Sequence, residues 1–277
     1  MRIRIKHETV YAYDQPARGL IQLLRLMPRD FDGQHVLRWR IEPDTDARLK
    51  LGEDAFGNLV HTLAAAGPLE RIAIRVTGEV ETSETHGVIR GAVERLPDAF
   101  FLRESSLATA DAAIQEFARD TAGNLNADPL GAVHRLLSAL HREVTFDTSP
   151  THSATTAAEA FAMRRGVCQD LTHILIASAR CCSFPARYVS GYLHRSDGVT
   201  SQEAGHAWAE VKVPELGWVG LDAANGISAS EGHVRVATGL DYLGAAPVRG
   251  SRYGGGSETL DVRLSVTSSQ GQSQSQE

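Results

Sequence analysis

Of the three cysteines in this chain of 277 residues, Cys168 stands where a thiol could do chemistry. It follows Gly166 and Val167 and precedes LTHILIASA, a segment that is apolar on nearly all sides, as in a helix buried at the centre of a domain. In the first turn of such a helix, free N–H groups and the positive end of the helix dipole act on the sulfur. They would lower the pKa of the thiol and stabilise an oxyanion that forms beside it.

A free cysteine is also commonly no more than a small buried apolar residue. Cys181 and Cys182, which end the predicted helix, fit this interpretation and are expected in the core. The same interpretation stays open for Cys168, because a nucleophilic thiol needs a base and a group that orients the base.

Candidates for both groups lie downstream. His206 begins a predicted strand in HAWAEV, and Asp222 ends the next predicted strand, GWVGLD. If these strands form an antiparallel hairpin through the turn at 214–217, their outer ends lie side by side and the two side chains can hydrogen-bond. Taken singly, such a histidine is more often an edge residue and such an aspartate a turn residue. Their order after Cys168, each at the end of an element, favours a nucleophile, a base and an orienting group.

Three further side chains are weaker candidates for substrate binding or oxyanion stabilisation. Gln169 lies beside the thiol, and a solvated first-turn glutamine is the alternative. Trp208 would wall the acyl site or donate its indole N–H, and core packing is the alternative. Tyr188 lies on the strand after the helix and would face the site. Asp170 suits the helix N-terminus electrostatically and is expected to be structural.

The elements that must position these residues change in character along the chain. Residues 1–85 contain short strand patterns separated by turn signals such as Asp14-Gln15-Pro16, which predicts an N-terminal β-sandwich. Segments 107–121 and 129–144 carry apolar residues three and four apart, which predicts amphipathic helices. Strand patterns follow the central helix, so residues 86–267 are expected to form a core in which a helical layer packs on an antiparallel sheet. The fold class is therefore α+β, and the polar stretch 268–277 is a predicted disordered tail.

Composition excludes several other classes of protein. The net charge of −6 gives no reason to expect nucleic acid or an anionic membrane as a partner. No apolar stretch approaches the roughly 18 residues of a membrane helix, and the opening MRIRIKHETVYAY alternates like a strand and lacks a signal peptide's apolar region. Three cysteines do not make a disulfide framework. A reducing, cytoplasmic location is expected.

Four stretches of the second half resemble the core of the bacterial transglutaminase-like superfamily, whose members are often described as candidate cysteine proteases. These stretches are GVCQD (166–170), PARYVSGY (185–192), HAWAEV (206–211) and GWVGLD (217–222). RIKHETVYAYD (4–14) and DAFGN (54–58) resemble the β-domain that accompanies this core, and HVRVA (233–237) and APVRG (246–250) resemble its carboxy-terminal part.

The resemblance implies a papain-like fold, a triad of Cys168, His206 and Asp222, and chemistry through an acyl-thioester. One departure is visible: relatives often follow the aspartate with Pro-Thr-Asn, whereas this chain has Ala223-Ala224-Asn225. Because the aspartate itself is present, we expect a changed loop and not a loss of chemistry.

The resulting hypothesis is hydrolysis of an amide or peptide bond, with transglutaminase activity and a non-catalytic interaction module as alternatives. The expected partner is a peptide, a protein or a small amide, with no cofactor, and the oligomeric state stays open. A metal site is disfavoured, because the paired C-x₂-C or H-x₃-H spacing of structural zinc sites is missing.

Overall fold

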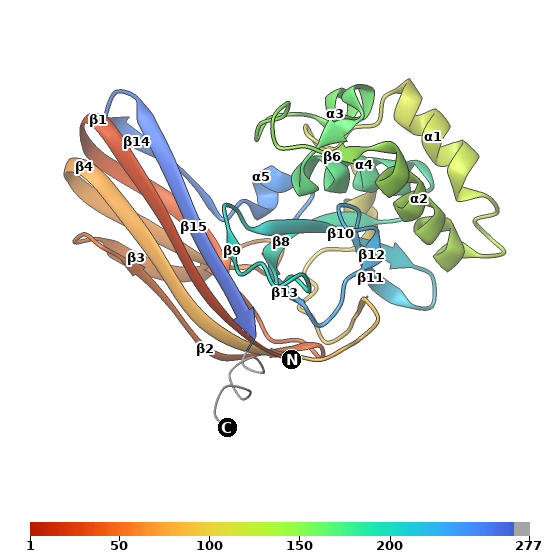
Figure 1. Ribbon diagram of the computed structural model, residues 1–277, viewed down its shortest axis with the longest axis horizontal. Coiled ribbons are helices and arrows are strands. Elements are labelled where there is room, and N and C mark those ends of the chain that lie inside the picture. Colours follow the sequence, from red (N-terminus) through yellow and green to blue (C-terminus); the bar gives the residue numbers. More distant parts are fainter. Residues whose placement is uncertain (269–277) are drawn as a thin grey trace.

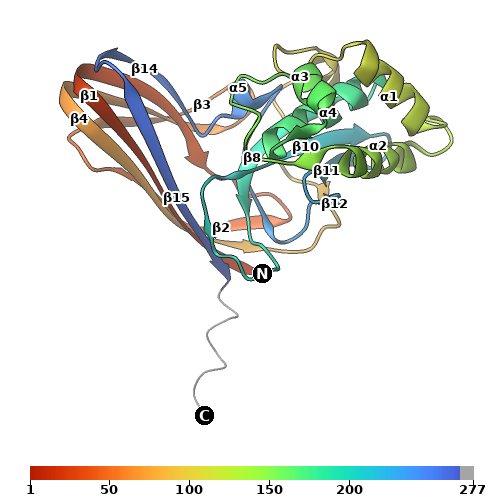
Figure 2. The same cartoon turned by 45° about the horizontal axis from the view of Figure 1, so that its top comes forward.

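Two large β-sheets, a small two-stranded sheet and a layer of helices form the regular structure of residues 1–268, the part of the chain that this computed structural model describes. Figure 1 shows the first sheet on one side of the molecule and the helices on the other, with the second sheet between them, and the view in Figure 2 agrees. The elements are, in chain order, β1 (Arg2–Met27), β2 (Gln34–Pro43), β3 (Arg48–Glu53), β4 (Leu59–Thr82), β5 (Val88–Ile89), the 3-10 helix η1 (Asp98–Leu102), α1 (Ala112–Ala122), α2 (Pro129–Glu143), β6 (Thr145–Phe146), α3 (Ala157–Met163), β7 (Arg165–Gly166), α4 (Cys168–Cys181), β8 (Ala186–Leu193), β9 (Ser201–Gln202), β10 (His206–Val213), β11 (Gly217–Asp222), β12 (Ile227–Ser228), β13 (His233–Gly239), α5 (Tyr242–Ala245), β14 (Val248–Gly254) and β15 (Glu258–Ser268).

The first sheet is built on two long strands, β1 and β4, which pair antiparallel along most of their length. In β1 the buried residues are first odd-numbered, such as Ile3 and Ile5, and later even-numbered, such as Leu20 and Leu24. Burial stays odd-numbered as far as Ala17, and the register shift between Ala17 and Gly19 accompanies the change of face, because one extra residue reverses the alternation of a strand. The turn signal at residues 14–16 falls in another register shift, between Ala12 and Ala17, so it makes an irregularity within one strand.

All strands of this region are hydrogen-bonded into one sheet, in the order β2-β4-β1-β15-β9, with β14 on β1 and β3 on β4. The predicted β-sandwich is therefore not confirmed. The C-terminal strands β14 and β15 were expected inside the core of residues 86–267, yet both pair with β1. The division at residue 85 stays a prediction, and the predicted tail, 268–277, lies outside the described residues except for Ser268, which ends β15.

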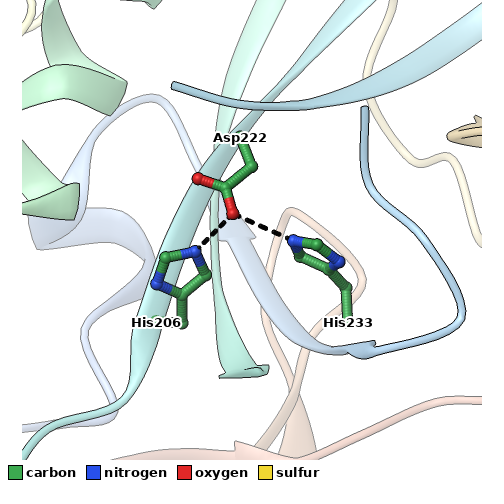
Figure 3. Close-up of side chains that lie close together, drawn as sticks. All are labelled: His206, Asp222 and His233. Atoms are coloured by element: carbon green, nitrogen blue, oxygen red, sulfur yellow. Dashed lines mark hydrogen bonds and ion pairs between the residues drawn. The ribbon is translucent and has the colours of Figure 1, made fainter. Parts of the chain in front are cut away.

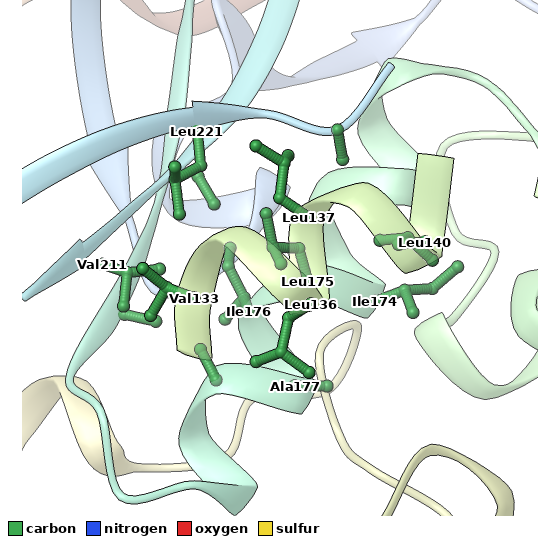
Figure 4. Packing of buried hydrophobic residues seen from close by; sticks show 14 of the residues in the cluster. Val133, Leu136, Leu137, Leu140, Ile174, Leu175, Ile176, Ala177, Val211 and Leu221 are labelled. Carbon is green, nitrogen blue, oxygen red and sulfur yellow. The ribbon is translucent and has the colours of Figure 1, made fainter. Parts of the chain in front are cut away.

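The second sheet has the order β12-β11-β10-β8-β13 and is covered by helices, so the expected helical layer on an antiparallel sheet is present. Helix α4 lies at the centre of the core, and its residues Leu171, Ile174 and Leu175 are at most 1% exposed. Figure 4 shows side chains of α2, α4, β10 and β11 packed together in one cluster. Helix α1 starts at Ala112, later than predicted, because the Asp111 side chain caps it by accepting from the N–H of Ile114.

Two amide side chains join the first region of the chain to the second sheet. Gln34 donates to the carbonyl of Arg235 at 2.9 Å and accepts from its N–H at 2.8 Å. Asn58 makes the same pair of bonds with the backbone of Thr238, both at 2.8 Å. Both contacts lie on β13, which ends the strand order of the second sheet. These side chains therefore fix the first region against the edge of the core.

No helix within residues 1–268 is both long and apolar enough to cross a membrane.

Candidate active site

Cys168 is the first residue of α4 and is half-buried, as the pattern around Gly166-Val167 predicts. The first N–H of the helix to reach a carbonyl is that of Asp170, which bonds to Val167 at 3.0 Å. The N–H groups of Cys168 and Gln169 therefore precede the helical hydrogen bonds. The Asp170 carboxylate accepts from the Val167 N–H and from the Thr151 hydroxyl, both at 2.8 Å, so Asp170 fixes the start of the helix.

The other two cysteines differ from each other. Cys182 is 8% exposed and lies in the core as expected. The expectation for Cys181 is wrong, because this residue is exposed. It is the last residue of α4, where the helix end turns it toward solvent, and apolar periodicity cannot place such a boundary residue.

His206 and Asp222 meet at the ends of β10 and β11, the contact that the hairpin argument predicts. His206 Nε2 lies 2.7 Å from Asp222 Oδ2, and the Asp222 side chain is fully buried. Burial lowers the pKa of His206, but the hydrogen bond to Asp222 and the proximity of Cys168 outweigh it and raise that pKa to about 10. Burial raises the pKa of Asp222, but its hydrogen bonds with His206 and His233 hold that pKa far below its usual range. A charged imidazolium at neutral pH follows.

His233 is a third member of this cluster that the sequence argument did not assign to the site. Its Nε2 lies 3.1 Å from Asp222 Oδ2 (Figure 3). The N–H of Ser230 donates to His233 Nδ1 at 3.1 Å, so the neutral ring carries its proton on Nε2 and donates it to Asp222. The signal available in the sequence was a histidine at the start of HVRVA, and β13 brings it to Asp222.

The loop after Asp222 departs from the family pattern, and the structure gives the consequence. Asn225 donates its side-chain amide to Asp222 Oδ2 at 2.7 Å and its backbone N–H to Oδ1 at 3.2 Å. The asparagine of the usual Pro-Thr-Asn is therefore the residue that contacts the carboxylate, and it is present here. The alanines at 223 and 224 leave these two hydrogen bonds intact.

Cys168 and His206 line one cavity of about 350 Å³, together with Gln169 and Tyr188. Its opposite wall comes from the first sheet and includes Tyr11, Leu260 and Val262 of β1 and β15. Burial, and next the charge of Cys168, raise the pKa of Tyr188 well above its usual value. The Tyr188 hydroxyl therefore keeps its proton and can donate a hydrogen bond inside this cavity.

Trp208 does not line this cavity in the described part of the chain. It is 1% exposed and packs with Val189 and Ala229. Its ring stacks on His206 at 6.2 Å and meets His233 edge to face at 5.1 Å, measured between ring centroids. These contacts agree with core packing, the alternative given for Trp208, and in them the indole holds the two imidazoles in place.

The ligand atoms of His206, Asp222 and His233 lie within 4.8 Å of one another, close enough to hold a metal ion. In this arrangement both Nε2 atoms are hydrogen-bonded to Asp222 Oδ2. A ring nitrogen that donates a proton cannot also bind a metal. The expectation of no metal and no cofactor stays a prediction.

Two family models match this chain. The model of the transglutaminase-like superfamily matches residues 115–223, and that of the bacterial transglutaminase-like N-terminal region matches residues 3–81. The chain belongs to the transglutaminase-like superfamily. The match to the superfamily core includes Cys168, His206 and Asp222, whereas His233 follows it.

Relatives of this superfamily member span its whole length. An uncharacterized protein of Mycobacterium leprae is 26% identical over 280 residues, which covers 96% of this chain and 98% of the relative. An uncharacterized protein of Mycobacterium tuberculosis H37Rv is 28% identical over 297 residues, which covers 98% and 94%. A crystal structure from Cytophaga hutchinsonii, of a protein provisionally called a cysteine protease, has a TM-score of 0.77 at 21% identity and covers 97% of this chain and 91% of that one, so the two share a fold.

Proposed function

We propose that this protein is a cysteine hydrolase that cleaves an amide or peptide bond through a thioester. The observation that carries the proposal is the position of His206, which is hydrogen-bonded to the buried Asp222 and lines the same cavity as Cys168. With Nε2 directed to Asp222, Nδ1 is the ring nitrogen available to the thiol. Family membership supports the same chemistry.

The reaction begins with the ion pair of a Cys168 thiolate and a His206 imidazolium. The sulfur attacks the carbonyl carbon, and the N–H groups at the start of α4 stabilise the oxyanion. As the carbon–nitrogen bond breaks, His206 donates its Nδ1 proton to the leaving amine, and an acyl-thioester remains. Neutral His206 then takes a proton from water, the hydroxide adds to the thioester, and collapse of that intermediate releases the acid and restores the ion pair.

The side chains around these atoms have supporting roles. Asp222 holds the imidazole in one orientation and stabilises its positive charge. The protonated hydroxyl of Tyr188 and the amide of Gln169 lie in the cavity as further donors to the carbonyl oxygen. General acid–base catalysis and oxyanion stabilisation each contribute about 10²-fold or more to the rate.

The test is a screen of peptide and amide substrates with and without an added primary amine. Wild-type protein should release the acid product, and Cys168→Ala should abolish turnover while its melting temperature stays close to that of wild type. Incorporation of the amine in place of water would assign transglutaminase activity, the alternative that uses the same thioester. Turnover that persists in Cys168→Ala would contradict the proposal.

A second measurement separates an enzyme from a non-catalytic interaction module. Iodoacetamide at pH 6 should alkylate Cys168, because the imidazolium of His206 stabilises the thiolate. The modified residue must be mapped by mass spectrometry, since Cys181 is also exposed. A thiol at position 168 that does not react would favour the interaction module.

A further inference from the structure

A second cavity, of about 490 Å³, adjoins the one that holds Cys168. The two cavities share Tyr11, Tyr242, Val248 and Leu260 in their linings. The second cavity lies between the inner face of the first sheet and the segment around α5. The two cavities are therefore direct neighbours, with these side chains at their boundary.

The side chain of Gln22, on β1, places an amide group in the wall of this cavity. Gln22 is 7% exposed and lines the cavity, and its Oε1 is buried with no hydrogen-bond partner among residues 1–268. A buried amide oxygen without a partner is rare in folded proteins, since its lost hydration is not replaced. The unpaired amide therefore points to a hydrogen bond that a ligand completes.

The local structure leaves room for the Gln22 side chain beside the cavity. Gly250, on β14, pairs with Gln22 across the sheet and also lines the cavity. A Cβ at position 250 would lie 2.8 Å from Cγ of Gln22 and would also collide with the carbonyl of Ile21. Only glycine leaves this space to the glutamine.

The rest of the lining is mostly aromatic or apolar, with two serines, Ser153 and Ser251, and charged side chains that already make contacts within the protein. Tyr13 and Tyr242 contribute rings, and Arg252 forms an ion pair with Glu258 at 3.1 Å. Arg249 donates to the carbonyl of Leu243 at 3.1 Å. A side-chain amide offers both N–H donors and an oxygen acceptor, so it can match a peptide group. The amide and the aromatic and apolar surface around it thus fit a peptide backbone with apolar side chains.

We propose that this second cavity binds the part of a peptide substrate that extends from the scissile bond, and that Gln22 hydrogen-bonds its backbone. The substrate class is then an extended peptide and not an isolated small amide. This inference rests on the proposed function, because the peptide's reacting bond must lie at Cys168.

Binding can be tested without catalysis by fluorescence polarisation of a dye-labelled hexapeptide pool on Cys168→Ala protein. The pool should bind, and adding Gln22→Leu should weaken binding by about 10-fold, the effect of one hydrogen bond to a buried amide. Gln115→Leu, a change at an exposed glutamine of α1, is the matched control and should leave binding unchanged. Equal affinity with and without Gln22→Leu, or no binding of the pool, would overturn the inference.

Further experiments distinguish a failure of the peptide-binding cavity from a failure of the proposed hydrolase activity. If Gln22→Leu fails to fold, judged by its melting curve, Gln22→Met supplies an unbranched apolar side chain of similar length for the same comparison. Cleavage is measured separately on protein with Cys168 intact. Hexapeptides and single-amide substrates cleaved equally well would refute the peptide cavity and leave the hydrolase standing. Binding that depends on Gln22 without any cleavage would refute the hydrolase alone.

Discussion

Asp222 accepts hydrogen bonds from two imidazoles, and this shared acceptor defines the role of His233. His233 does not line the cavity, so it acts through Asp222 as a positioning residue. Because the Ser230 N–H fixes its tautomer, His233 offers Asp222 a donor of constant direction. The carboxylate, and with it the ring of His206, is thereby held in one orientation.

We expect His233→Ala to lower kcat by about 10-fold with KM nearly unchanged, because it removes orientation and no substrate contact. His233→Gln keeps a side-chain N–H donor and should restore much of the activity. His86→Ala, at an exposed histidine, serves as control. Equal losses in the Ala and Gln variants, measured by steady-state kinetics, would assign His233 to packing alone.

The raised pKa of His206 makes stability depend on pH in a defined direction. In the unfolded chain the imidazole titrates near pH 6.5, and in the fold its pKa is about 10, since Asp222 and Cys168 outweigh the effect of burial. The stabilisation is therefore fully present below about pH 6.5 and is lost as the pH rises through about 10. Urea titrations of wild type and His206→Gln should show a difference in unfolding free energy that shrinks over this interval. If the difference in unfolding free energy does not change with pH, His206 does not have a raised pKa in the fold.

The sequence was informative for side chains whose element ends could be recognised locally. Cys168 follows Gly-Val and precedes an apolar helix, and His206 and Asp222 flank one hairpin. The pattern HVRVA did not show that His233 would meet Asp222, and Gln22 carried no local signal. Strand β13 brings His233 to Asp222, and β14 lies beside Gln22 on β1; such pairing of distant segments is set by tertiary structure.

At the scale of elements, the start of α4 depends on a carboxylate. Asp170 is 1% exposed and accepts from Val167 and Thr151, so it links the helix start to the loop that precedes α3. The sequence interpretation of Asp170 as structural agrees with these contacts. The position of the Cys168 sulfur follows from this cap.

Asp170→Ala should destabilise the protein by about 1–2 kcal/mol, because it removes a helix cap and leaves the Val167 N–H unpaired. Activity should fall as well, since the first turn carries Cys168. Asp120→Ala, at an exposed position of α1, is the control for loss of a negative charge. Chemical denaturation measures the stability, and an unchanged midpoint would show that other contacts fix the helix start.

The elements also explain why the first region has longer strands than predicted. Asp14-Gln15-Pro16 has the composition of a turn, and short strand patterns on either side suggest separate strands. In the structure β1 continues through this point with a register shift, and β4 matches it along most of its length. Turn-type residues are compatible with both a turn and an irregular strand, and only the partner strand decides between them.

At the scale of the whole molecule, chain segments far apart in sequence combine into one binding region. Strands β14 and β15 pair with β1, and the wall opposite Cys168 comes from that sheet. Local patterns cannot reveal pairings across some 240 residues, such as Tyr13 with Glu258. The predicted sandwich is therefore not confirmed, and the division at residue 85 stays a prediction. The first region is thus part of the cavity and not a separate attachment.

Removing one amide link between the two regions should therefore affect both stability and cleavage. We expect Asn58→Ala to cost about 1–3 kcal/mol, because it leaves the backbone N–H and carbonyl of Thr238 without their buried partner. Asn126→Ala, in the exposed turn before α2, is the matched control. Thermal melting would detect the loss, and a variant as stable as wild type would show that this link is dispensable.

The hydrogen bonds of Gln34 and Asn58 with the backbone of β13 have a consequence for solubility. The outer strand of a sheet offers its unpaired backbone groups to any other extended chain, and this is a common route to aggregation. Here two side-chain amides occupy that role and pair with the strand as a neighbouring backbone would. Two side chains from the first region of the chain thus occupy backbone groups at the outer edge of β13, where a second molecule could otherwise pair with the sheet.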